Sequence, residues 1–327
     1  MVQANEKTRI AWIDIVRGIG IFLVIMGHTY RSNQVLNWIV SFHMPLFFIL
    51  SGWLRGCNRK TFEWKTFILK KIQAFLVPLV IFQFLTYLYW LVIESRFRGF
   101  DFGPMWFLIA LFVAEVVSEL IVDFSGFLGA AIATVVSAVG LYLTSMIVEP
   151  ATLLAWLPRC MGATLFFLIG VLVSKFIPVS KVTLDNKSRI LVPIMAVGGV
   201  LLSQINGRVD LYFLLFGNYF IYIMAALVGS AFIYCLAMQI RENRFLEHIG
   251  RYSIIILCTH EPIKRAVIQV LSIVSRVPGE TLRNNILIGF TIAVAVLLIE
   301  LIVIQIVKYV ADILRKTKFE CFVAFVK

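Results

Sequence analysis

The stretch DIVRGIGIFLVIMGHTY, residues 14–30, has the apolar character and length of a membrane-spanning helix, yet it contains three ionisable side chains. These residues are Asp14, Arg17 and His28. An ionisable side chain is costly in hydrocarbon, so within a span it usually faces the interior of a helix bundle or a polar cavity. The stretch therefore predicts a first span that lines a cavity.

The rest of the chain has the same apolar character. Its 327 residues are 61% hydrophobic and 15% charged, with a mean hydropathy of +0.93, which excludes a soluble globular protein of this size. We predict an all-α polytopic transmembrane helix bundle, organised as a single membrane-embedded domain over residues 1–327. About ten spans are expected, at residues 10–30, 35–54, 72–93, 105–122, 127–147, 157–177, 190–205, 219–239, 253–275 and 285–313.

The distribution of Lys and Arg predicts the orientation in the membrane. One set of alternate loops is rich in them: residues 55–71, 175–189, 241–251 and the segment after 314, together with Lys7 and Arg9. The other set contains only Arg31, Arg96, Arg98, Arg159, Arg208, Arg276 and Arg283. By the positive-inside rule both termini are expected to be cytoplasmic. The net charge of +12 then reflects topology and anionic lipid contact, and no nucleic-acid partner is expected.

The three ionisable residues of the first span share one side of the helix. At about 100° per residue, Arg17 and His28 lie about 20° apart around the axis, and Asp14 is one turn before Arg17. Asp14 and Arg17 alone would fit a structural pair near the helix end, and His28 alone would fit a histidine hydrogen-bonded at the membrane interface. Their alignment favours a functional site, since histidine is the side chain best suited to general base catalysis near neutral pH.

Further segments, taken in order, resemble the acyltransferase 3 family of integral membrane O-acyltransferases. The opening helix matches through Asp14, Arg17 and the Gly27-His28 pair. The other similar segments are SFHMPLFFILSGWL (41–54), FILKKIQAFLVP (67–78), GPMWFLIALFVAE (103–115), FFLIGVLVSK (166–175) and IGRYSIIILCTHEPI (249–263). The resemblance spans nearly the whole chain.

The resemblance implies transfer of an acetyl group from cytoplasmic acetyl-CoA to a hydroxyl of a carbohydrate, such as a surface polysaccharide or its lipid-linked precursor. It also implies a location in a bacterial cytoplasmic membrane. His28 would act as general base or carry the acyl group briefly, and Arg17 with Asp14 would organise its surroundings or stabilise the donor. The phosphates of the acetyl-CoA cofactor need cations, and Lys70 and Lys71 are the candidates.

Five other residues are candidates for binding the acceptor substrate, each with a simpler structural alternative. His43 precedes a proline that can kink its span, but it can equally be a packing residue. Trp106 can stack on a sugar ring or anchor the span at the membrane interface. Glu115, His260 and Glu261 are ionisable residues inside spans and are functional candidates for that reason.

The main alternative function is a transporter or flippase for a glycan or a small polar solute, because such proteins also have charged residues in broken spans. An internal repeat of broken helices would favour that alternative, and the sequence shows none. It also shows no cluster with metal-ligand spacing, and the five cysteines are scattered, so neither a metal nor a disulfide framework is expected. Membrane lipids and a carbohydrate acceptor are the expected partners.

Overall fold

The computed structural model describes residues 10–31, 33–59, 63–95, 102–178, 186–317, 323 and 325–326. Helices dominate these ranges, and their one strand-like feature is an isolated bridge between Asp210 and Leu215. The helices are α1 (Ala11–Thr29), α2 (Asn33–Cys57), α3 (Trp64–Lys71), α4 (Val77–Val92), α5 (Trp106–Ile147), α6 (Trp156–Phe176), α7 (Asn186–Asn206), α8 (Tyr219–Ile240), α9 (Arg244–Arg251), α10 (Ser253–Ser275), α11 (Gly279–Asn284) and α12 (Ile286–Leu314). The prediction of an all-α polytopic bundle is confirmed.

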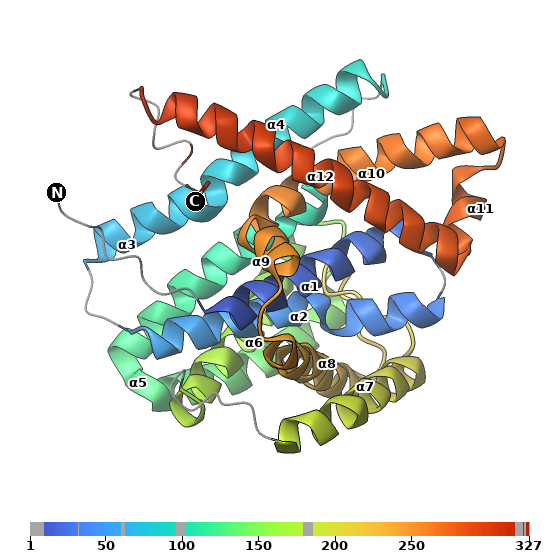
Figure 1. Ribbon diagram of the computed structural model, residues 1–327. Helices are drawn as coiled ribbons and strands as arrows, with labels where there is room; N and C mark the ends of the chain where they lie inside the picture. Colours follow the sequence, from blue (N-terminus) through green and yellow to red (C-terminus); the bar gives the residue numbers. More distant parts are fainter. Residues whose placement is uncertain are drawn as a thin grey trace.

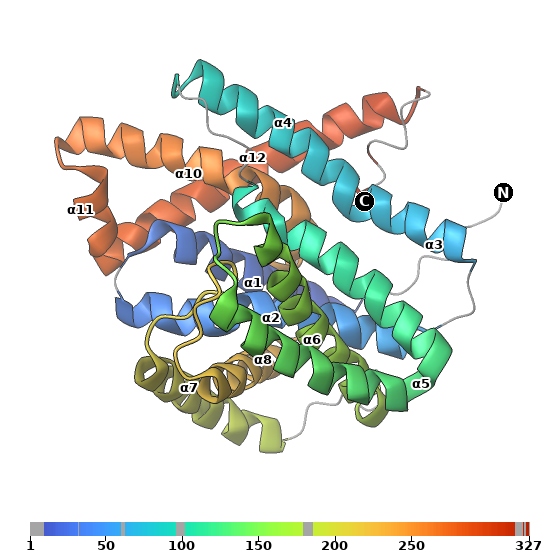
Figure 2. The same cartoon turned by 180° about the vertical axis from the view of Figure 1, so that it is seen from behind.

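All ten expected spans are found as helices, with ends shifted by a few residues. Two of them form the arms of α5, which meet at Gly126, where φ is 62° and the ribbon turns sharply (Figure 2). A π-helical turn at Ile72–Leu76 joins α3 to α4. Within the described ranges, eight helices are long and apolar enough to cross a membrane. This number is two below the ten expected spans, because the two arms of α5 count as one helix and because the charged residues of α10 exclude that helix.

Helix α1 runs through the middle of the bundle (Figure 1). It contacts α2, α8, α9, α10 and α12. Helices α4, α10 and α12 lie on one side of it, and α2, α5, α6, α7 and α8 lie on the other. A helix surrounded by protein can contain polar side chains that lipid would not tolerate, which explains why the ionisable residues of the first span are placed here.

Glycines allow the central helices to approach each other until their backbones touch. A Cβ atom at Gly52 of α2 would overlap the carbonyl oxygen of Phe167 in α6, and a Cβ atom at Gly170 of α6 would overlap that of Ile49 in α2. Helix α2 is therefore fixed against α6 by two reciprocal glycine contacts. Small residues at crossings are typical of membrane bundles, where van der Waals packing replaces the hydrophobic effect.

The same arrangement fixes the first half of α1 against α9, a short helix that the sequence did not predict. A Cβ atom at Gly18 would overlap the carbonyl oxygen of Leu246, and one at Gly250 would overlap that of Asp14. Helix α9 begins at an N-cap, Asn243, whose side chain accepts a hydrogen bond from the Leu246 backbone N–H at 2.9 Å.

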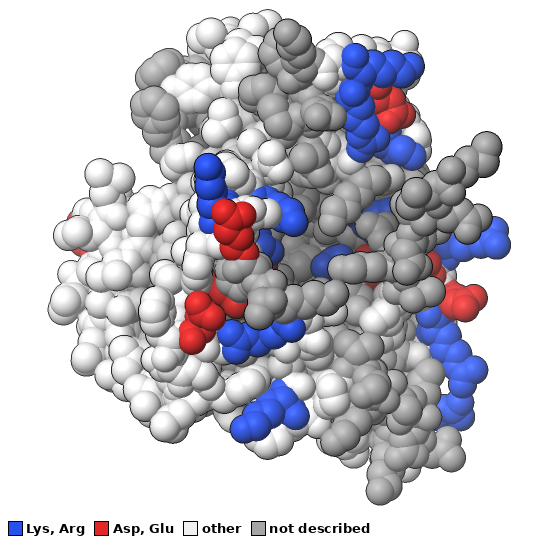
Figure 3. Space-filling model, turned by 90° about the vertical axis from the view of Figure 1, so that its left-hand side faces the viewer, with Lys and Arg blue, Asp and Glu red and all other residues white. Residues whose placement is uncertain are grey.

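Helix α1 begins and α12 ends at the same face of the bundle (Figure 1). Figure 3 is a view onto this face. Lys and Arg side chains surround a central hollow of this face, together with a smaller number of Asp and Glu. This gathering of cations agrees with the sequence pattern, while the cytoplasmic location of the face stays a prediction. Lys7, Arg9, Arg96 and Arg98 lie outside the described residues.

Replacing Gly52 by Ala is expected to destabilise the protein, because the new methyl group meets backbone and α2 must move away from α6. Overpacking of this kind costs roughly 1–3 kcal/mol of unfolding free energy. Gly198→Ala is the matched control, since no atom lies within 4 Å of a Cβ atom added there. Thermal unfolding of the purified variants in mild detergent measures both effects. Equal stability of the two variants would contradict the close contact.

Candidate functional site

A cavity of about 600 Å³ lies at the end of α1 that contains His28. Its walls come from α1, α2, α4, the turn before α5, the connection between α7 and α8, α10 and α11. Four of the ten candidate residues line it: His28, His43, Trp106 and Glu261. Segments that are far apart in the sequence therefore meet around His28.

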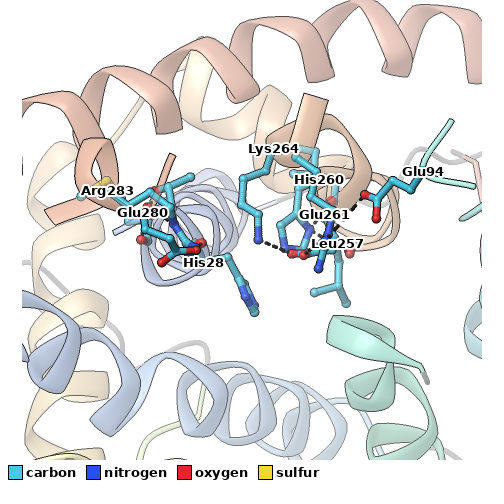
Figure 4. A network of polar contacts seen from close by, with 12 residues as sticks. His28, Glu94, Leu257, His260, Glu261, Lys264, Glu280 and Arg283 are labelled. Carbon is cyan, nitrogen blue, oxygen red and sulfur yellow. Dashed lines mark hydrogen bonds and ion pairs between the residues drawn. The ribbon is translucent and has the colours of Figure 1, made fainter. Parts of the chain in front are cut away.

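The imidazole of His28 extends from α1 into the space between the helices, beside α10 (Figure 4). His260 of α10 packs against it, with 5.2 Å between the ring centroids and 49° between the ring planes. His260 is fully buried, and its Nδ1 lies 2.9 Å from the carbonyl oxygens of Ile256 and Leu257. The two histidines form a pair, with His28 on the cavity wall and His260 behind it.

A network of ion pairs follows on the same face of α10. Glu261 accepts hydrogen bonds from Lys264 at 2.6 Å and from Arg265 at 3.0 Å. Arg265 also lies 3.6 Å from Glu94, at the end of α4. All these groups except Glu94 line the cavity. Three of the four lie in α10, which the sequence predicts to be a span, and their mutual pairing makes their burial tolerable.

Arg283 of α11 holds the last turn of α1. Its Nη2 donates to the carbonyl oxygen of His28 at 2.7 Å, and its Nε donates to that of Thr29 at 3.0 Å. The last carbonyls of a helix have no partner inside the helix, and a cation at this end also interacts favourably with the helix dipole. Arg283 therefore fixes the backbone from which the His28 side chain projects.

Aromatic rings form part of another wall. Trp106 lies 5.7 Å, centroid to centroid, from Tyr212 in the connection between α7 and α8. Arg159 of α6 stacks on the Tyr212 ring at 4.0 Å and donates to its carbonyl oxygen at 2.9 Å. The Asp210 side chain accepts hydrogen bonds from the backbone N–H groups of Tyr212 and Phe213. These contacts order the non-helical connection between α7 and α8, which forms one wall of the cavity.

Asp14 and Arg17 lie at the other end of α1, about 16 Å from His28 along the axis in the case of Arg17. Their side chains form an ion pair of 3.3 Å, with Asp14 buried and Arg17 partly exposed. Neither lines the cavity. The structure thus brings the pair together as expected but does not bring it into contact with the imidazole.

A second group of ion pairs lies near the same end of the bundle. Lys71 contacts Glu115 of α5 at 2.6 Å, and Arg55 of α2 contacts Glu119 of α5 at 2.6 Å. Glu115, a candidate for acceptor binding, is therefore next to Lys71, a candidate for donor binding, and is not on the cavity wall. Lys70 is exposed.

The sequence analysis missed Lys264, Arg265, Arg283 and Tyr212, all of which line the cavity. Lys264 and Arg265 follow Glu261 at spacings of three and four within a span, which is a signal for helical ion pairs that could have identified them. Arg283 and Tyr212 lie in connections between spans, where no local pattern marks them.

His28, His260 and Glu261 are the residues of the described chain that could hold a metal ion, with one potential ligand atom of each within 4.8 Å of the others. Glu261 is already bound by two cations, so a metal ion would have to compete with Lys264 and Arg265 for this carboxylate.

The fold and the cavity define a polytopic membrane protein with a histidine-based site inside its bundle. Residues 10–304 match the acyltransferase domain of the acyltransferase 3 family, so the chain belongs to this family. Its class is accordingly that of a membrane acyltransferase. No curated protein and no solved structure matches the chain.

Replacing Arg283 by Gln is expected to lower the free energy of unfolding by roughly 1–3 kcal/mol, because two carbonyl groups at the end of α1 lose a charged hydrogen-bond donor. Arg276→Gln is the control, since Arg276 is exposed at the end of α10. Thermal unfolding in detergent compares the variants. A stability of Arg283→Gln equal to that of the control would show that the end of α1 does not depend on this contact.

Proposed function

We propose that this protein transfers an acetyl group from acetyl-CoA to a hydroxyl group of a carbohydrate, in the cytoplasmic membrane of a bacterium. The observation that carries the proposal is the imidazole of His28, which lies on the wall of a cavity inside the bundle of a chain that belongs to an acyltransferase family. Family membership also favours acyl transfer over transport of a glycan or solute.

The chemistry requires a base, because a sugar hydroxyl is too weak an acid to attack a thioester unaided. His28 takes the hydroxyl proton as the oxygen attacks the thioester carbonyl. The new C–O bond forms, the C–S bond breaks, and the proton passes to the departing thiolate. General base catalysis of this kind contributes about 10²–10⁴-fold in rate. Transfer through an acetyl group held briefly on His28 uses the same side chain and remains an alternative path.

The lining of the cavity suits a carbohydrate acceptor. Aromatic rings such as Trp106 and Tyr212 offer flat apolar surfaces, and sugars have apolar ring faces that pack on them. Charged groups such as Glu261 and Arg265 offer acceptors and donors for hydroxyl groups. A wall that combines a few polar groups with aromatic surface is typical of small-molecule sites.

The donor is proposed to enter from the opposite face, where cations surround a hollow (Figure 3). Lys70 is exposed and can contact a phosphate directly, while Lys71 is paired with Glu115 and adds positive charge next to it. Arg17, with Asp14 beside it, lies between this face and His28 and would interact with the extended donor. The acetyl group at the far end of the donor would then reach His28.

His28→Ala is expected to abolish acetylation, because the base or acyl carrier is removed. The test is mass spectrometry of surface glycans from a deletion strain complemented with each variant. His248→Ala is the matched control, because His248 lies on α9 and outside the cavity. Loss of one acetyl unit per repeat in the deletion strain and in His28→Ala, with restoration by His248→Ala, is the expected result. Acetylation by well-expressed His28→Ala at the wild-type level would contradict the mechanism.

Lys70→Glu is expected to weaken acetyl-CoA binding about tenfold or more, which corresponds to the loss of a charged contact of about 1.5–3 kcal/mol. Lys65→Glu on the same helix is the control, since it makes the same charge change at another exposed position. Lys71 is left intact because its removal would strand Glu115 without its cation. Binding of labelled acetyl-CoA to the protein in lipid nanodiscs is the measurement, and equal affinities would remove Lys70 from the donor site.

A further inference from the structure

His260 has one nitrogen with a defined role and one without. Its Nδ1 lies 2.9 Å from two backbone carbonyl oxygens, those of Ile256 and Leu257. Carbonyl oxygens only accept hydrogen bonds, so Nδ1 must carry the proton of the neutral ring. The Nε2 atom is then unprotonated, and its lone pair can only accept. The backbone of α10 therefore selects the tautomer of His260.

The Nε2 atom of His260 is buried and has no hydrogen-bond partner among the described residues. A buried polar atom without a partner costs about 1–3 kcal/mol, and native proteins rarely keep one without a reason. The ring of His28 is a neighbouring group that can supply a donor, since its centroid lies 5.2 Å from that of His260 and one nitrogen of each ring lies within 4.8 Å of the other. Such a separation is closed by a small side-chain rotation or bridged by one water molecule.

Glu261 is the other group close enough to orient His28, and a carboxylate has this role in many catalytic triads. Here its two oxygens accept hydrogen bonds from Lys264 at 2.6 Å and from Arg265 at 3.0 Å. These two cations balance its charge and hold it in place along α10. Figure 4 shows Lys264 pointing toward Glu261. The Nε2 atom of His260, by contrast, accepts no hydrogen bond from any described residue, so we assign it as the acceptor for an N–H of His28.

We infer that His260 is a positioning residue whose Nε2 accepts the N–H of His28, directly or through one water molecule, and so leaves the other nitrogen of His28 unprotonated toward the cavity. The inference rests on the proposed function of His28 as the reacting imidazole. It assigns to His260 the role that a carboxylate has in a Ser-His-Asp triad, with a neutral acceptor in place of a charged one. A neutral acceptor suits a site within the membrane, because it adds no buried charge.

Two amide substitutions separate this role from that of a backbone anchor. The side chain of His260→Gln places a carbonyl oxygen near the position of Nε2 and so keeps an acceptor for His28. The shorter side chain of His260→Asn keeps a donor for the carbonyls of Ile256 and Leu257 but loses that acceptor. His260→Ala loses both. Acyl transfer is followed with labelled acetyl-CoA added to membrane vesicles that contain the natural acceptor.

We expect His260→Ala and His260→Asn to lose about 10²-fold in rate, which is within the contribution of a general base, and His260→Gln to stay within about tenfold of wild type. The KM for acetyl-CoA should not change, because His260 is fully buried and does not line the cavity. Thermal unfolding of each variant in detergent accompanies the rate measurements, so that rates are compared among folded proteins.

Three results would overturn the inference. Wild-type rates in all three variants would show that His260 does not act on His28. A better rate for His260→Asn than for His260→Gln would show a backbone anchor. A stoichiometric metal ion in the purified wild-type protein, lost on substitution of either histidine, would make the pair a metal site. If His28→Ala itself retains acetylation, the proposed function fails first; wild-type rates in the His260 variants beside an inactive His28→Ala remove only the positioning role.

Discussion

Close backbone contact between helices, made at glycines, is the constraint on which the position of the site depends. Helices in lipid gain little from burying apolar side chains against one another, so close van der Waals contact has to hold them together. Gly18 and Gly250 bring α1 and α9 into such contact near the start of α1. Arg283 then binds the carbonyls at its other end. Helix α1 is thus held near both of its ends, and the His28 ring projects from the end that Arg283 binds.

Ion pairs set the register of the helices around this support. Lys71 with Glu115 links α3 to α5, Arg55 links α2 to α5, and Arg265 with Glu94 links α10 to the end of α4. In a medium of low dielectric constant, a helix that slid by one turn would leave charges unpaired at a cost of several kcal/mol. The pairs also divide the polar interior into two groups, one at each end of the bundle. The proposed reaction, with one substrate entering at each end, fits such a division.

The spans and the central histidine could be predicted from the sequence because their signals are local. Runs of apolar residues define the helices, and His28 is conspicuous within such a run. The partners of these residues could not be predicted, because pairing depends on contacts between distant segments. The sequence does not show that Glu115 and Lys71 are in contact, and for this reason they were predicted to belong to different sites. Similarly, the periodicity of α10 does not reveal that His260 faces α1. Helix α9 was not predicted, because its 8 residues are too few to give the apolar run by which the spans were recognised.

The charge content of α10 has a consequence for the biogenesis of the protein. With Glu261, Lys264 and Arg265 in one helix, α10 is a poor substrate for the translocon, since each charged residue near the centre of a segment costs about 2.5–3.5 kcal/mol on insertion scales. Its charges find partners in one another and in Glu94, which precedes them in the chain. Glu94 and His28 have therefore been synthesised before α10 begins, so that the second histidine joins the first only at a late stage of assembly. The imidazole of His28 remains without its neighbour until α10 has been synthesised.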